Sequence, residues 1–244
     1  MDQIKRALIM AAGIGERMRP VTLDTPKPLV SVHGVRFLDS EIAALHTVGI
    51  EDIVVVTGHL AEQFQDLETR YPGVRLVFNP DYNKGNNITS LYRARHYLDR
   101  AAVIMDGDIL IRNPDVLRTE ISRSGYSCPW ADYDPGEWFF LCDDSLTITG
   151  AQTECKPGWE LKSISFWTEA DVLRLRHQLE TVYESDNIRD NYWDYIPLIR
   201  HWGDYDLRVY PLQQTDILEI DSFRELCLED PSYEHYLEKG DNET

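Results

Sequence analysis

The sequence predicts an α/β fold: a Rossmann-like, mostly parallel sheet with helices on both faces and a small antiparallel extension. Short apolar runs alternate with helical patterns over about the first 110 residues, and this order is typical of parallel βαβ units. The run 53–56 (Ile-Val-Val-Val) is continuously apolar, as expected for a strand that is covered on both faces. After residue 113, shorter strand patterns separated by Asp, Gly and Pro indicate the antiparallel part.

The expected elements follow from apolar periodicity in chain order. In the first half we expect strands at 7–10, 53–57, 74–78 and 102–105, with helices at 38–48, 61–71 and 88–97. In the second half we expect strands at 126–130, 138–142, 146–149, 163–167, 207–210 and 217–219, with helices at 169–183 and 190–201.

The composition limits the class of protein. Hydrophobic residues make up 43% of the 244 residues, which supports a substantial core and argues against disorder. The 24 Lys and Arg residues against 42 Asp and Glu give a net charge of −18, which would repel nucleic acids and anionic membranes. We find no signal-peptide core and no apolar run of membrane-spanning length, so we expect a cytoplasmic protein. The four scattered cysteines indicate neither a zinc site nor a disulfide framework.

A glycine-rich segment directly follows the first expected strand. Gly13 and Gly15 would let backbone amides approach a polyanion, and Arg17 adds positive charge to an otherwise acidic chain. The carboxyl ends of parallel strands open onto the ligand crevice of such sheets, so this segment predicts a phosphate site. It is neither a Walker loop nor a dinucleotide fingerprint, because the spacing of glycines and lysine differs. Taken alone, the glycines would also suit an ordinary turn.

Lys27 completes a longer pattern, Ala-Ala-Gly-x-Gly-x-Arg-x-x-Pro-x-Thr-x-x-x-Pro-Lys-x-Leu, which begins in this segment. The pattern resembles the signature of the nucleoside-diphosphate-sugar pyrophosphorylase-like nucleotidyltransferases. The resemblance implies that Ala12, Gly13 and Gly15 bind the phosphates of an NTP. It implies catalytic roles for Arg17, which would help to hold the phosphates, and for Lys27, which would neutralise their charge. Such transfers depend mainly on positioning and charge neutralisation.

Two acidic motifs are candidates for a divalent cation. Asp106 and Asp108 follow a buried strand pattern, and Glu219 and Asp221 lie on one face of a short late strand. The resemblance implies that Asp108 and Asp221 bind Mg²⁺, with Glu219 as a further, supporting ligand and Asp106 at the nucleotide. Without the resemblance, Asp106 and Asp108 would equally suit a turn, and Asp221 would equally suit the cap of a helix that begins near Ser222.

A narrower resemblance covers most of the chain. The run 79–92, Asn-Pro-Asp-Tyr-Asn-Lys-Gly-Asn-Asn-Ile-Thr-Ser-Leu-Tyr, is similar to a motif of the bacterial phosphocholine cytidylyltransferases. The motifs Glu-Trp-Phe at 137–139, Ser-Phe-Trp at 165–167, Tyr-Trp-Asp at 192–194 and Glu-Ile-Asp-Ser at 219–222 match in the same order. The resemblance implies CTP as the nucleotide, bound by Asn79, Asn87 and Ser90, although such side chains also make ordinary loop and cap bonds.

The aromatic motifs indicate a cationic acceptor. A quaternary ammonium donates no hydrogen bonds and is best held over aromatic faces with carboxylates nearby. We therefore expect six residues at the acceptor: Glu137, Trp138, Asp190, Tyr192, Trp193 and Asp194. Phosphocholine fits this description. A primary ammonium would fit the same place if the carboxylates accept its protons, so 2-aminoethylphosphonate, the substrate of the related phosphonate cytidylyltransferases, and phosphoethanolamine stay open.

The sequence thus predicts a Mg²⁺-dependent cytidylyltransferase that converts CTP and phosphocholine to CDP-choline and pyrophosphate. We expect one domain, with a nucleotide-binding half at 1–112, an acceptor-binding half at 113–228 and an acidic tail at 229–244. A sugar-1-phosphate nucleotidyltransferase and a non-catalytic nucleotide-binding domain are the alternatives. We expect no nucleic-acid or membrane partner, and the sequence leaves the oligomeric state open, a homodimer included.

Overall fold

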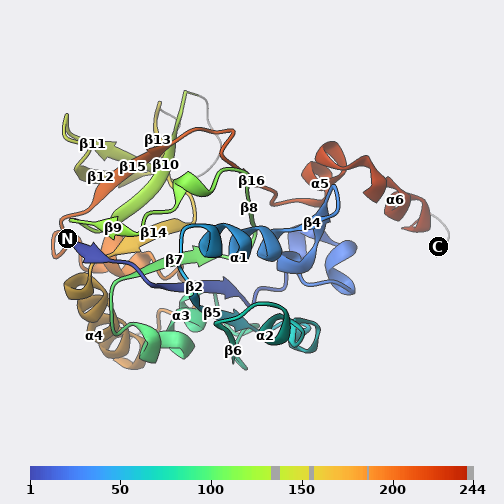
Figure 1. Cartoon of the computed structure of the whole chain (residues 1–244), viewed down its shortest axis with the longest axis horizontal. Coiled ribbons are helices and arrows are strands. Elements are labelled where there is room, and N and C mark those ends of the chain that lie inside the picture. Colours follow the sequence, from blue (N-terminus) through green and yellow to red (C-terminus); the bar gives the residue numbers. More distant parts are fainter. Residues whose placement is uncertain (133–137, 154–156, 186, 241–244) are drawn as a thin grey trace.

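The computed structural model describes residues 1–132, 138–153, 157–185 and 187–240, and within them one large mixed sheet forms the centre of the fold (Figure 1). Its strands β7, β2, β5 and β6 are parallel neighbours in that order. The strands of this sheet, in spatial order, are β12 (Ile148–Gln152), β11 (Phe139–Cys142), β13 (Gly158–Glu160), β10 (Gly125–Ala131), β14 (Ile164–Trp167), β7 (Ala102–Asp106), β2 (Arg6–Ala11), β5 (Asp52–Thr57) and β6 (Val74–Phe78), while β15 (Arg208–Leu212) pairs with β10.

Helices cover both faces of the parallel strands, and β2 shows why. All six residues of β2 are buried, and alternate side chains of a strand point to opposite faces. Ala7 and Ile9 belong to the hydrophobic cluster formed with α1 (Phe37–Thr47). Leu8 belongs to the cluster on the other face, formed with α3 (Ile88–Ala94) and α4 (Glu169–Ser185). The continuously apolar strand patterns are thereby explained, and the predicted fold class is confirmed.

The second half of the chain adds the antiparallel extension. β14 runs antiparallel to β7, β10 runs antiparallel to β14, and β13, β11 and β12 continue the sheet in antiparallel fashion. One strand of this region, β13, was not predicted, because it is only three residues long and its first residue is Gly158. The extension lies to one side of the parallel strands in Figure 1.

Two expected helices differ from the structure. The helix expected at 61–71 is divided into a 3₁₀ turn, Ala61–Phe64, and the short α2, Leu67–Arg70. The helix expected at 190–201 is reduced to one π-helical turn, Ile196–Arg200. Pro197 lies in that turn and has no N–H to donate to a preceding carbonyl, so a regular helix does not run through it. Residues 187–194 have no regular secondary structure, and four of them, Asp190, Asn191, Tyr192 and Asp194, line cavities.

Short ribbons and the C-terminal helices complete the described chain. β8 (Ile109–Ile111) pairs with β16 (Ile217–Glu219), a pairing that was not predicted from the sequence. Residues 229–244 were expected to be an acidic tail, but helical structure continues to residue 240. The remaining strands and α-helices are β1 (Asp2–Gln3), β9 (Glu120–Ile121), β3 (Ser31–Val32), β4 (Val35–Arg36), α5 (Phe223–Glu229) and α6 (His235–Gly240).

Specific contacts hold the C-terminal segment in place. Tyr233 donates a hydrogen bond of 2.8 Å from its hydroxyl to the Ser31 carbonyl, and the Asp230 carboxylate accepts a bond of 2.8 Å from the His33 amide. Leu226 belongs to a buried apolar cluster with Met18, close to the glycine-rich loop. The segment is therefore part of the packed structure near that loop.

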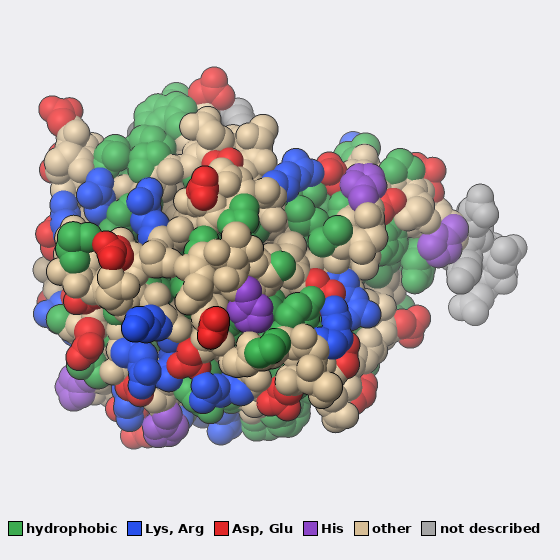
Figure 2. Space-filling model, viewed as in Figure 1, with side chains coloured by type: hydrophobic (Ala, Val, Ile, Leu, Met, Phe, Trp, Pro, Cys, Tyr) green, Lys and Arg blue, Asp and Glu red, His purple; other side chains and the backbone are tan. Residues whose placement is uncertain are grey.

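Ion pairs are distributed over the surface. Figure 2 shows acidic and basic side chains interspersed across the visible face. Arg70, for example, lies 2.8 Å from Asp39 and 2.9 Å from Asp66.

Among the described residues, no helix is both long enough and apolar enough to cross a bilayer.

Candidate active site

The glycine-rich loop leaves the end of β2 and reverses at Gly15. Gly15 has φ of 67°, and its carbonyl accepts hydrogen bonds of 2.7 Å from the Thr22 hydroxyl and 2.9 Å from the Met18 amide. A Cβ at this position would lie 2.9 Å from Thr22 Cγ2 and 3.2 Å from Lys27 Cβ. Both the left-handed backbone and the close packing therefore require glycine.

The loop lines a cavity of about 680 Å³. Ala12, Gly13 and Gly15 are at its wall, and Gly13 faces open space, since a Cβ built there would meet no atom within 4 Å. Asn87 and Ser90 line the same cavity from α3 and the residue before it. The structure thus brings most of the predicted nucleotide-binding residues to one cavity at the carboxyl end of the parallel strands.

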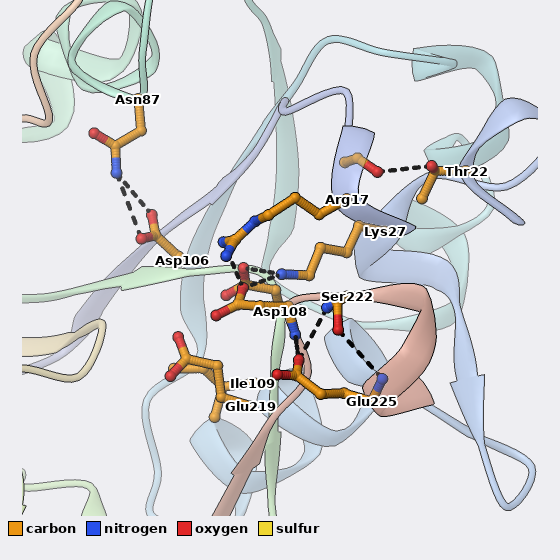
Figure 3. A network of polar contacts seen from close by, with 12 residues as sticks. Arg17, Thr22, Lys27, Asn87, Asp106, Asp108, Ile109, Glu219, Ser222 and Glu225 are labelled. Carbon is orange, nitrogen blue, oxygen red and sulfur yellow. Dashed lines mark hydrogen bonds and ion pairs between the residues drawn. The ribbon is translucent and has the colours of Figure 1, made fainter. Parts of the chain in front are cut away.

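A network of opposite charges forms the floor of this cavity (Figure 3). Lys27 Nζ lies 2.8 Å from Asp108 Oδ2 and 2.8 Å from Asp221 Oδ1, and Arg17 Nη2 lies 3.2 Å from the same Asp221 oxygen. Burial opposes the charge of the Lys27 ammonium, but the two carboxylates outweigh it and raise the pKa of Lys27. Burial also works against Asp221, yet Lys27 and Arg17 keep its pKa below the usual range. Lys27 and Asp221 are therefore both charged near neutral pH.

The β8–β16 ribbon brings the two carboxylates together. Asp108 immediately precedes β8, and Asp221 lies two residues beyond β16, whose last residue, Glu219, is paired with Ile109. The helix that follows is capped by Ser222, which forms a reciprocal capping box with Glu225. Asp221 is therefore not the cap, and its side chain is available to the site.

Asp108 and Asp221 suit a divalent cation whose coordination is completed by substrate oxygens. Asp108 Oδ1 is buried and has no hydrogen-bond partner, which leaves one anionic oxygen unsatisfied. Among the residues that the structure describes, no group of three His, Cys, Asp or Glu side chains is arranged to hold a metal by itself. Mg²⁺ is commonly bound by one or two carboxylates together with substrate phosphates and water. The pair suits this kind of site.

Glu219, predicted as a further metal ligand, has another partner in the structure. Lys162 Nζ lies 2.8 Å from Glu219 Oε2 and 2.7 Å from Glu160 Oε1. Burial raises the pKa of Glu219 to about 7. Its contact with Lys162 supports a role in holding the wall of the site, and its role as a ligand stays a prediction.

Asn87 connects three segments around Asp106. Its Nδ2 donates to Asp106 Oδ1 over 3.2 Å, and its Oδ1 accepts a bond of 2.9 Å from the Trp193 amide. Burial, with Asp108 and Asp194 nearby, raises the pKa of Asp106 well above its usual range. A cation close to Asp106 would lower this pKa again and favour the ionised carboxylate.

The structure corrects the prediction for Asn79. Its side chain is fully buried at 0% exposure and does not line the cavity. Its side-chain Nδ2 donates to Thr89 Oγ1 over 3.0 Å and to Ser90 Oγ over 3.2 Å. Its Oδ1 accepts a hydrogen bond from the backbone amide of Asp81. Asn79 therefore supports the start of α3 and does not contact a ligand directly.

A second cavity of about 540 Å³ adjoins the first. The two share five lining residues: Arg17, Asp106, Asp108, Tyr192 and Asp221. The second cavity adds aromatic and apolar groups, among them Trp138, Tyr195 and Leu198, and the carboxylate of Asp194. The charged network thus lies at the boundary between a glycine-lined cavity and an aromatic one.

The residues predicted at the acceptor have different surroundings. Trp193 is 4% exposed and stacks on Tyr126 with ring centroids 6.5 Å apart, so it belongs to the core and its prediction is wrong. Asp190 lines the first cavity, Trp138 lines the second, and Tyr192 lines both. Glu137 lies outside the described residues.

Tyr195 is an aromatic cavity residue that was not predicted from the sequence. It lies three residues after Tyr192, and both side chains line the second cavity. The spacing i, i+3 in a segment expected to be helical would have indicated a shared face. Three aromatic side chains, Trp138, Tyr192 and Tyr195, therefore contribute to this cavity.

The pH dependence of stability should report on Asp194. Burial raises the pKa of Asp194 to about 7, and the Tyr126 hydroxyl donates to its Oδ1 over 2.7 Å. In the unfolded chain this carboxyl titrates near about pH 4. The folded state therefore keeps its proton to higher pH, and the associated stability is lost as pH rises from about 4 to 7.

Asp194→Asn keeps the Oδ1 acceptor and cannot ionise. We expect the melting temperature of the variant, relative to wild type, to rise across this pH range and to level off above it. A constant difference from pH 4 to pH 8 would contradict a buried, protonated Asp194.

Several known proteins are similar to this chain in sequence. Residues 7–154 match the model of a family described as the MobA-like NTP transferase domain. The 2-aminoethylphosphonate cytidylyltransferase of Lancefieldella rimae is 37% identical over 232 residues, which cover 95% of this chain and 94% of that protein. The choline-phosphate cytidylyltransferase of Streptococcus pneumoniae is 34% identical over 220 residues, covering 90% of this chain and 94% of that protein.

Solved structures give the same result. The CTP:phosphocholine cytidylyltransferase of S. pneumoniae superposes with a TM-score of 0.85 at 32% identity, covering 94% of this chain and 99% of that one. An inositol-1-phosphate CTP transferase of T. maritima superposes with a TM-score of 0.70 over 99% of both chains, but at 16% identity it shows a common fold alone.

Proposed function

This chain belongs to the MobA-like NTP transferase family, among the bacterial phosphonate and choline-phosphate cytidylyltransferases, and from this we propose that it transfers CMP from CTP to a small phosphate or phosphonate bearing an ammonium group. The observation that carries the proposal is the junction of the two cavities at Asp108 and Asp221, the two carboxylates that Lys27 contacts from the first cavity. One side of this junction suits a triphosphate, and the other suits an organic cation.

In the proposed reaction, backbone amides of the glycine-rich loop hold the β- and γ-phosphates of CTP. An oxygen of the acceptor phosphate attacks the α-phosphorus and forms a new P–O bond, while the bond from the α-phosphorus to the β-phosphate oxygen breaks and pyrophosphate leaves. The protein supplies no nucleophile, because a phosphate is already ionised near neutral pH. Lys27 and Arg17 neutralise the charge that develops on the leaving group.

Mg²⁺ is part of the proposal. Asp108 and Asp221 would hold it, and when bound it would neutralise charge on the phosphate oxygens of both substrates. The unsatisfied oxygen of Asp108 supports this assignment.

Phosphocholine is our first choice of acceptor. Trp138, Tyr192 and Tyr195 offer aromatic faces in the second cavity, and a quaternary ammonium binds such faces without needing hydrogen-bond acceptors. 2-Aminoethylphosphonate is the second candidate, because the carboxyl groups of Asp106 and Asp194 line the same cavity and their oxygens would accept hydrogen bonds from a primary ammonium.

Pyrophosphate release with CTP and Mg²⁺ tests the proposal. The acceptors compared would be phosphocholine, phosphoethanolamine, 2-aminoethylphosphonate and a sugar 1-phosphate. Preference for phosphocholine would support an aromatic cage, formed by Trp138, Tyr192 and Tyr195, for a quaternary ammonium. Preference for 2-aminoethylphosphonate would instead support hydrogen bonds from a primary ammonium to the carboxyl groups of the second cavity. Turnover of the sugar 1-phosphate alone would contradict an ammonium-bearing acceptor, and silence with all four would contradict the proposed activity.

Trp138→Ala should mainly weaken acceptor binding. Cation–π contacts contribute about 0.5–2 kcal/mol, so the Michaelis constant of the acceptor should rise roughly 2- to 30-fold, with little change for CTP. Trp130→Ala is the matched control, because Trp130 is 52% exposed and lines neither cavity. Equal effects of Trp138→Ala on CTP and acceptor would count against the cage.

A further inference from the structure

The strand β8 has a neighbouring strand along one edge and a helix along the other. Residues Ile109–Ile111 pair with β16 at the first edge. At the other edge, the Ile109 amide donates to Glu41 Oε1 over 3.0 Å, and the Ile111 amide donates to Ser40 Oγ over 3.1 Å. Amides two residues apart in a strand point to the same side. Two adjacent side chains of α1 thus take the place of a further strand.

This edge is close to the reacting groups. Ile109 directly follows Asp108, and it pairs with Glu219, two residues before Asp221. The α1 side chains therefore hold the backbone from which Asp108 extends toward Lys27. A misplacement of about 1 Å of a group that positions substrates can reduce turnover by about a hundredfold.

Glu41 is an unusual residue for a purely structural contact. It is 0% exposed, and its Oε2 is buried without a hydrogen-bond partner. A half-satisfied carboxyl costs stability in a place where an apolar side chain of the same length would pack freely. Burial raises the pKa of Glu41 well above its usual range, which opposes ionisation of the group. Compared with methionine, an apolar residue of similar length, Glu41 offers one additional feature, the Oε1 oxygen that accepts the hydrogen bond from the Ile109 amide.

We propose that Glu41 is a positioning residue that, together with Ser40, holds β8 so that Asp108 faces Asp221, and thereby sets how strongly a divalent cation promotes CTP binding. The inference rests on the proposed function, because it assumes that these carboxylates bind a cation together with CTP. Glu41 itself touches neither substrate nor metal in this assignment; it acts through the backbone of Ile109.

The test compares CTP binding in Mg²⁺ and in EDTA by calorimetry, without any acceptor. Glu41→Met has a similar length and no acceptor, and Glu41→Gln keeps a carbonyl oxygen for the Ile109 amide. Supporting groups around metal ligands commonly change metal affinity by about 10- to 100-fold. We expect Glu41→Met to reduce the Mg²⁺-dependent gain in CTP affinity roughly tenfold. Affinity in EDTA should stay the same, and Glu41→Gln should resemble wild type.

Gln178→Met is the matched control, because it removes a buried polar side chain that is bonded to Asp204 and Tyr205 and lines neither cavity. It should lower the melting temperature without changing the response to Mg²⁺. If Glu41→Met does not fold, Ser40→Ala removes the Ile111 bond and should reduce the Mg²⁺ response by a smaller factor.

An unchanged Mg²⁺ response in Glu41→Met or, where that variant does not fold, in Ser40→Ala would overturn the inference. An equal loss of the Mg²⁺-dependent gain in CTP affinity in Glu41→Met and Glu41→Gln would also overturn it. So would a wild-type protein whose CTP affinity does not depend on Mg²⁺. A wild type that binds CTP with Mg²⁺ but transfers CMP to no acceptor would refute the proposed function, while the Glu41 comparison would still be decided by binding.

Discussion

Lys27→Ala should reduce kcat by about a hundred- to a thousandfold, the range observed when a group that stabilises transition-state charge is removed. The Lys27 side chain is only 12% exposed, and its Nζ lies 2.8 Å from both Asp108 and Asp221, the carboxylates shared by the two cavities. At this point it would neutralise charge on the departing pyrophosphate. Steady-state pyrophosphate release at saturating CTP and acceptor measures the effect.

Lys5→Ala is the control for this variant, because Lys5 is exposed and lines neither cavity. Removal of Lys27 also leaves Asp108 and Asp221 facing each other without their shared cation, so the melting temperature should fall, and Mg²⁺ should restore part of it. A variant that keeps more than about a tenth of the wild-type kcat would show that Lys27 does not carry this charge.

The sequence predicted the parallel strands and the glycine-rich loop well, because both depend on local patterns. A continuously apolar strand such as β5 is recognised from its own residues. Gly15 is recognisable in the same way, since its left-handed backbone is built into the turn after β2. The position of Asp108 beyond β7 follows from the rule that ligands bind at the carboxyl ends of parallel strands.

Contacts between distant segments could not be predicted in this way. Trp193 and Tyr192 are neighbours in the sequence, but Trp193 packs in the core while Tyr192 is 60% exposed. The hydrogen bond from the Trp193 backbone amide to the Asn87 side chain, 106 residues earlier, is part of this arrangement. Glu41 appears in the sequence as an ordinary charged residue of a helix. Its burial depends on β8 lying against α1, and β8 was not predicted.

Asp108→Asn should have the second large effect. The substitution preserves shape but removes one of the two negative charges proposed to hold Mg²⁺, and Asp108 Oδ1 is the oxygen that the protein leaves unsatisfied. We expect kcat/KM for CTP to fall by about a hundredfold or more, and the Mg²⁺ concentration for half-maximal rate to rise at least roughly tenfold. A Mg²⁺ titration of initial rates measures both.

Asp221→Asn and Asp66→Asn make the comparison specific. Asp221 shares Lys27 with Asp108, so its variant should show the same shift in Mg²⁺ requirement, whereas Asp66 pairs with Arg70 at the surface and its variant should behave as wild type. If both site variants lose rate but keep the wild-type Mg²⁺ requirement, the carboxylates act by orienting Lys27, and the cation must be bound by the phosphates alone. A higher Mg²⁺ requirement in both variants would instead show that the two carboxylates hold the metal. The bound cation would then neutralise negative charge on the phosphates of both substrates.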